Sequence, residues 1–171
     1  MNRKRDMKGF TMMEVMVAII IIAIGLLGIA GLQLLAIRNT TGAGLRTVAT
    51  QLAYDITDRM RANEKAVVAG YYSTLAAPSG SPPCYSSSCT PQQLAALDMQ
   101  SWLTRVQNTL PAGAAIICQD STAPEASTSA APGCDNVVGS PWMVKIFWTE
   151  LNEEVNPPTV QERVYITSFI P

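Results

Sequence analysis

The stretch that decides the fold is K-G-F-T-M-M-E-V-M-V-A-I-I, residues 8–20. It opens one of the most apolar parts of the chain, since no side chain from Val15 to Leu32 is charged or polar. A run of about 18 such residues is the length that marks a transmembrane helix. Glu14 stands directly before this run, although an ionised carboxylate at the centre of a bilayer costs roughly 2.5–3.5 kcal/mol. The position of this acid therefore needs an explanation.

Charge and composition restrict the classes of function. The apolar run follows four basic residues, Arg3, Lys4, Arg5 and Lys8. Such a flank keeps its end of a membrane helix in the cytoplasm, so the rest of the chain lies outside. The net charge of −1 argues against nucleic-acid binding, which depends on neutralising phosphates. The chain has no histidine and no Walker or G-x-S-x-G motif, so we expect a non-enzymatic protein without a cofactor.

The apolar run and the sequence after it predict a long helix in two parts. Residues 10–38 form the membrane-spanning part, and residues 39–66 form an amphipathic continuation. One apolar stripe follows the continuation at helical spacing: Leu45, Val48, Leu52, Ile56 and Met60. We expect the first part to be surrounded by lipid or other helices, and the second part to pack against a globular domain.

The remainder, residues 67–171, predicts a small α+β domain. Thr90, Pro91 and Gln93 form a helix start with a capping box, and Pro111 ends that helix.

Three apolar segments after this helix predict an antiparallel sheet: residues 114–119, 141–150 and 160–169. One face of the second segment carries Trp142, Val144, Ile146 and Trp148. Lys145 and Thr149 lie on its opposite face. In the third segment the apolar side carries Val160, Val164 and Ile166. We expect both tryptophans in the core, and the alternative is a carbohydrate-binding platform.

Four cysteines follow the apolar run: Cys84, Cys89, Cys118 and Cys134. An even number in a loop-rich exported domain indicates two disulfides. The sequence leaves three pairings open. We favour Cys84–Cys89 with Cys118–Cys134, because each pair brackets its own Ser/Pro-rich loop. The alternative is one zinc site made of all four, which the spacing disfavours because it lacks a C-x2-C pair.

The start of the chain resembles the type III signal sequence of a type IV prepilin. The shared pattern is a short basic leader ending in Gly9, then Phe10, then Glu14 as the fifth residue of the mature chain, then a long apolar helix. The two residues before this glutamate are usually Leu and Ile in the family and are Met12 and Met13 here. The resemblance implies a pilin-like fold.

Later segments resemble the PilV group of minor pilins. They are L-A-Y-D-I-T-D-R-M-R-A-N (52–63), L-D-M-Q-S-W (97–102), T-L-P-A-G (109–113) and F-W-T-E (147–150). The Ser/Pro-rich loops carry little of the likeness, so the matching parts span about half of the chain.

The resemblance implies a route of processing and assembly. A prepilin peptidase cuts between Gly9 and Phe10, removes the leader (residues 1–9) and methylates the amine of Phe10. The mature chain is anchored in inner-membrane lipid with its domain in the periplasm, and an assembly platform then moves it into the filament. There the Glu14 carboxylate neutralises the amine of a neighbouring subunit, because buried charges need partners.

The implied function is that of a minor pilin. With other minor pilins and the major pilin, it primes pilus assembly at or near the tip, beside a tip adhesin, and supports adhesion and twitching motility. The main alternative is a minor pseudopilin of a type II secretion system. A DNA-uptake pilin is a third interpretation, which the mild acidity disfavours.

Two simpler interpretations of the N-terminus are also open. The first is a secretory signal peptide whose mature chain starts at Gly31, and the second is a plain membrane anchor with Glu14 at the interface. The acids Asp98, Asp120, Glu153 and Glu154 could form a carboxylate pair or a calcium site, but they lack metal-loop spacing.

Overall fold

A computed structural model describes residues 9–73, 84, 88–122, 128–152 and 157–170 of the chain. Predictions that concern other residues, such as Glu153 and Glu154, lie outside the described residues. The chain divides into two compact units, Met1–Gly42 and Ala43–Pro171. The described elements are α1 (Met12–Ala62), α2 (Glu64–Val68), α3 (Pro91–Thr109), β1 (Ala114–Gln119), β2 (Trp142–Asn152) and β3 (Thr159–Phe169).

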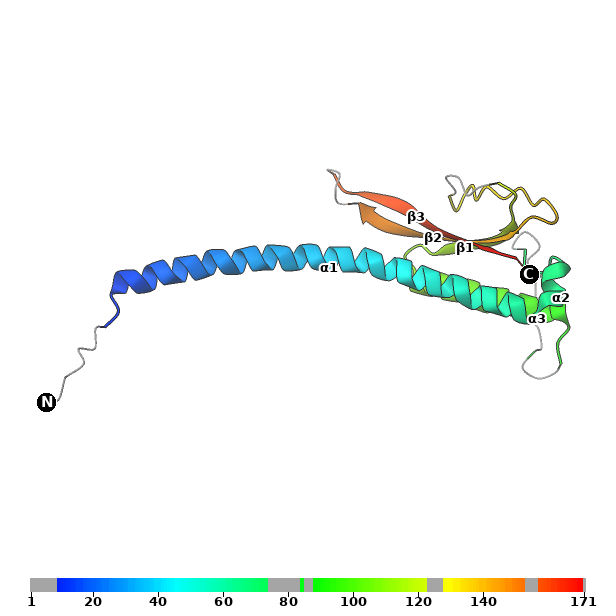
Figure 1. Cartoon of the computed structure of the whole chain (residues 1–171), viewed down its shortest axis with the longest axis horizontal. Helices are drawn as coiled ribbons and strands as arrows, with labels where there is room; N and C mark the ends of the chain where they lie inside the picture. The colour runs from blue at the N-terminus through cyan, green and yellow to red at the C-terminus, as the bar shows by residue number, and fades with distance from the viewer. Residues whose placement is uncertain (1–8, 74–83, 85–87, 123–127, 153–156, 171) are drawn as a thin grey trace. The chain divides into compact units, whose positions relative to one another are not determined.

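Helix α1 begins in the first unit and ends in the second (Figure 1). The pattern predicted helix as far as residue 66, but α1 ends at Ala62 and the shorter α2 follows. The break lies at Asn63, whose backbone is non-helical with φ −123° and ψ 53°. Its buried side chain donates from Nδ2 to the Pro91 carbonyl, at 2.9 Å. This long-range bond stabilises the break, and no local sequence pattern predicts the bond.

Helix α3 confirms the predicted capping box. The Gln93 N–H donates to the Thr90 hydroxyl, and the Thr90 N–H donates to the Gln93 side chain. After α3 the chain turns through Ala112, at φ 49°, and Gly113. A Cβ on Gly113 would lie 2.4 Å from the Val106 carbonyl oxygen, so this turn requires glycine.

The three strands form one antiparallel sheet in the order β1-β2-β3. The central strand aligns Val144 with Ile117 of β1 and with Thr167 of β3. This confirms the α+β class and the antiparallel sheet.

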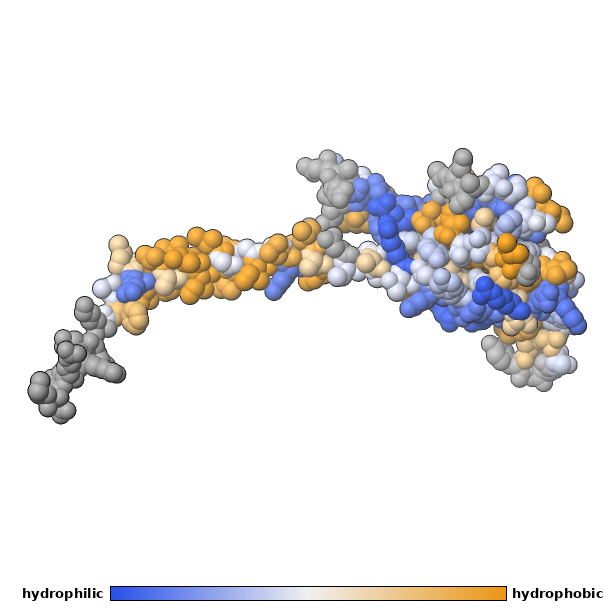
Figure 2. Space-filling model, viewed as in Figure 1, coloured by the Kyte–Doolittle hydropathy of each residue, from blue (hydrophilic) through white to orange (hydrophobic). Residues whose placement is uncertain are grey.

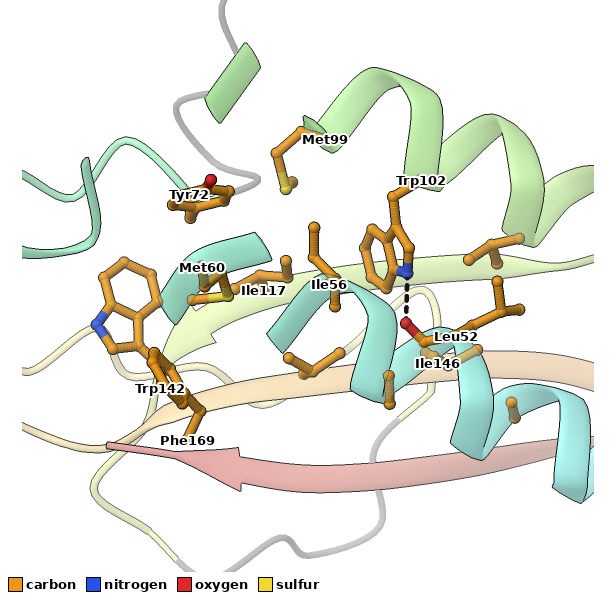
Figure 3. Packing of buried hydrophobic residues seen from close by; sticks show 14 of the residues in the cluster. Leu52, Ile56, Met60, Tyr72, Met99, Trp102, Ile117, Trp142, Ile146 and Phe169 are labelled. Carbon is orange, nitrogen blue, oxygen red and sulfur yellow. Dashed lines mark hydrogen bonds between the residues drawn. The ribbon is translucent and has the colours of Figure 1, made fainter. Parts of the chain in front are cut away.

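The core of the second unit lies between the sheet and the two long helical segments (Figure 3). The stripe of α1 supplies Leu52, Ile56 and Met60, and α3 supplies Met99 and Trp102. All four predicted apolar residues of β2 face this core: Trp142, Val144, Ile146 and Trp148. We call this the inner face of the sheet. Because both tryptophans are buried in this core, they do not form a carbohydrate-binding platform on the surface.

The opposite, outer face of the sheet is also covered. Met143, Lys145 and Phe147 alternate with the core residues along β2, and all three are buried. Residues 128–141 lie over this face, on the side away from α3 (Figure 1). In β3 the half-buried Tyr165 packs against the inner core, whereas Val160 on the outer face is 68% exposed. The apolar side of the third predicted strand is therefore its outward side.

Candidate processing and assembly segment

The segment that contains Gly9, Phe10 and Glu14 is exposed and lies at the start of α1. The Phe10 side chain is 83% exposed. Thr11 caps the helix, because its hydroxyl and its carbonyl both accept from the Glu14 N–H, at 3.2 and 3.1 Å. Glu14 is thus the third residue of α1, where the helix dipole favours an acid. The T-x-x-E signature, T-M-M-E at 11–14, could have revealed this cap from the sequence.

The Glu14 carboxylate is exposed, and it has no side-chain partner among the residues that the structure describes. Its helix-capping contact uses the backbone N–H alone. The carboxylate therefore lies exposed at the start of α1.

The first unit presents an apolar surface to its surroundings. The large hydrophobic side chains from Phe10 to Ile37 are each 48–87% exposed. They form an almost continuous apolar surface along the first part of α1 (Figure 2). Within the described residues, α1 is the helix long and apolar enough to cross a membrane. Because each fully buried large side chain contributes about 1.5–3 kcal/mol, this surface favours lipid or other helices over water.

A second arrangement of polar residues joins α1 to α3 in the globular unit. This α1–α3 polar seam consists of Asp55, Arg59, Asn63, Asp98, Ser101 and Arg105. Asp55 and Arg59 are four residues apart in α1, so they share one face of that helix, and Asn63 follows at its end. Arg59 contacts Asp55 and Asp98, each at 3.3 Å. Burial lowers the pKa of Arg59, but the two carboxylates outweigh it and raise the pKa.

Tyr72 closes the buried end of the seam. Its hydroxyl is fully buried and donates to Asp98 Oδ2 at 2.7 Å, and it accepts from Asn63 Nδ2 at 3.4 Å. Burial first, and then the bond to Asp98, raises the pKa of Tyr72 well above its usual value. The segments 52–63 and 97–102, which carried the resemblance, therefore supply all of the seam residues except Arg105.

The four cysteines form two disulfides, Cys84–Cys89 and Cys118–Cys134. These are the pairs that the loop-bracketing argument favoured, so the four thiols do not share one zinc site.

The acids proposed for a carboxylate or calcium site are separated. Asp98 belongs to the α1–α3 polar seam, whereas Asp120 pairs with Lys145 on the outer face of the sheet. Among the described residues, no group of three or more His, Cys, Asp or Glu side chains could hold a metal ion.

Two family models match the chain. The model described as "Prokaryotic N-terminal methylation motif" matches residues 4–30. The model described as "Type IV pilin Tt1218" matches residues 31–100. The chain belongs to the type IV pilin superfamily. No curated protein and no solved structure matches this pilin significantly.

The match to the superfamily indicates a role for the exposed N-terminal segment. The methylation motif covers Gly9, Phe10 and Glu14, and it implies processing by a prepilin peptidase and assembly with other pilins. Together with the apolar helix, it fits anchoring in the inner membrane followed by incorporation into a pilus.

Proposed function

We propose that this pilin is a minor pilin of the PilV kind, which primes pilus assembly and is incorporated at or near the tip. In this proposal the peptidase cleaves after Gly9, and Phe10 becomes the methylated N-terminus of the mature chain. Residues 10–38 first lie in the membrane and then join the filament core. The periplasmic domain then docks other minor pilins, the major pilin and a tip adhesin, which supports adhesion and twitching motility.

The observation that supports the assembly step is the exposed carboxylate of Glu14, which has no side-chain partner among the described residues, beside an exposed apolar helix. When the helix enters a bundle, water leaves and the carboxylate requires a positive partner. Cleavage supplies one, because it creates an amine at Phe10 of every subunit. A contact between Glu14 of one subunit and Phe10 of another would neutralise both charges and set the register of docking.

The test separates processing from assembly. N-terminal sequencing of the mature protein should begin at Phe10. E14A should leave that cleavage intact but reduce recovery of the subunit in sheared pili. Glu64→Ala, at an exposed acid of α2, is the matched control and should be recovered normally. Normal recovery of E14A would contradict the role of Glu14, and a mature chain that starts at Gly31 would contradict the processing step.

A gene deletion tests the wider function. We expect it to reduce piliation and twitching while type II secretion continues. Loss of secretion with normal piliation would instead identify a pseudopilin.

A further inference from the structure

Lys145 is a charged residue at the centre of the central strand, yet it is completely buried. It lies on the outer face, between Ile116 of β1 and Ile166 of β3. A lysine ammonium has three donors, and here its Nζ contacts three oxygens. They are Asp120 Oδ2 at 2.7 Å, the Pro132 carbonyl at 2.7 Å and the Gly133 carbonyl at 3.4 Å.

All three partners of Lys145 belong to the segment that Cys118 and Cys134 close. Asp120 follows the first cysteine by two residues, and Pro132 and Gly133 directly precede the second. The ion pair and the disulfide therefore hold Asp120 and residues 132–134 together at the outer face of the sheet. Burial raises the pKa of Asp120, but the bonds from Lys145 and Thr122 outweigh it and lower the pKa, which agrees with an ionised pair.

Several other contacts of this segment lie near the surface. Asp135 accepts from the N–H and the hydroxyl of Ser121, and Glu162 accepts from the Ser129 N–H. These bonds are exposed, so water can replace them at little cost. The Lys145–Asp120 pair differs, because both side chains are only 1% exposed. Losing one partner of a buried pair costs far more than losing an exposed one.

Access to the disulfide depends on this segment. Thiol–disulfide exchange requires a thiolate to reach one of the two sulfurs. Cys118 is fully buried and Cys134 is half-buried, so a thiolate reaches the sulfurs more readily when the residues beside Cys134 lift from the sheet. Lifting these residues also separates Lys145 from the carbonyls of Pro132 and Gly133.

We propose that Lys145 is a latch that protects the Cys118–Cys134 disulfide from thiol reductants. The coupling is reciprocal: the disulfide holds the carbonyls near the ammonium, and the ammonium holds the segment closed over the sulfurs. The Cys84–Cys89 disulfide lies in a different segment and has no bond to Lys145 among the described residues. It should therefore be insensitive to the latch.

The test compares the two disulfides within one molecule. Full-length protein in detergent micelles is treated with graded dithiothreitol, the free thiols are alkylated, and each cysteine pair is quantified by mass spectrometry. In K145M, Cys118–Cys134 should be reduced at least about tenfold faster than in the wild type, while Cys84–Cys89 keeps its wild-type rate. Lys65→Met, at an exposed lysine of α2, should change neither rate.

Two results would overturn the proposal. One is an unchanged rate for Cys118–Cys134 in K145M with a native circular dichroism spectrum. The other concerns D120N, which keeps the shape of the acid and leaves two carbonyl partners to Lys145. D120N is the decisive variant if K145M fails to fold and both of its disulfides become sensitive to dithiothreitol. It should accelerate the reduction of Cys118–Cys134 alone, by a few-fold. A wild-type rate of reduction in D120N would refute the latch.

Discussion

Replacing Tyr72 with Phe should destabilise the globular unit, chiefly through loss of the short hydrogen bond from its hydroxyl to Asp98. The hydroxyl donates to the carboxylate of Asp98 at 2.7 Å, and the tyrosine is fully buried. Hydrogen bonds to charged groups contribute about 1.5–3 kcal/mol. Asn63 also loses a weak partner but keeps the Pro91 carbonyl. For a unit the size of Ala43–Pro171, this loss should lower Tm by roughly 5–15 °C.

The assay is thermal unfolding followed by circular dichroism, on full-length protein in detergent. The matched control is Tyr71→Phe, because Tyr71 is the half-buried neighbour and its hydroxyl has no hydrogen bond in the described structure. Its Tm should stay within about 2 °C of the wild type. Equal Tm values for Y72F and Y71F would refute the assigned role of the Tyr72–Asp98 bond.

The same variant makes a prediction at alkaline pH. Because burial and then Asp98 raise the pKa of Tyr72 above its ordinary value of about 10, the folded state holds the phenol proton more tightly than the unfolded state. This contribution to stability is complete below pH 10 and is lost as the pH rises beyond it. The difference in free energy of unfolding between wild type and Y72F should therefore shrink above about pH 10. A constant difference would contradict the raised pKa.

Two further substitutions test the packing of α3. Gly113→Ala should lower the free energy of unfolding by about 1–3 kcal/mol, because its Cβ would lie 2.4 Å from the Val106 carbonyl oxygen. The control is Gly44→Ala, whose Cβ would have no atom within 4 Å and which should be neutral or stabilising. Equal melting temperatures of the two variants would contradict the requirement for glycine in this turn. Trp102→Phe removes the buried N–H that donates to the Leu52 carbonyl at 2.8 Å. The free energy of unfolding, measured in urea, should fall by at least about 1 kcal/mol. An unchanged midpoint would show that this bond does not stabilise the α1–α3 contact.

Local signals in the sequence were sufficient for most of the fold. The residues of β1 were predicted without error, and the capping box of α3 is present as expected. Both signals depend on neighbours within a few residues. The end of α1 was misplaced, because Asn63 is held by Pro91, which lies 28 residues further along the chain.

The candidate site likewise has one part that the sequence predicted and one part that it did not. The leader pattern at Gly9, Phe10 and Glu14 is a fixed local spacing, and a family model matches it. The α1–α3 polar seam was not predicted, because contacts such as Arg59–Asp98 and Arg105–Asp55 join residues 39 and 50 positions apart. The sequence marked these segments as similar to minor pilins without showing what their polar residues do.

By itself, the sequence predicted an N-terminal methylation motif, one long apolar helix and an α+β domain, because short motifs and hydrophobic periodicity depend only on residues that are close together in the chain. Only the tertiary structure decided which faces of the sheet are covered. Alternation along β2 placed Lys145 opposite the core, but alternation does not say what lies beyond that face. Residues 132 and 133, next to Cys134, lie over it, so a lysine on the polar side of a strand becomes a fully buried charge with three partners.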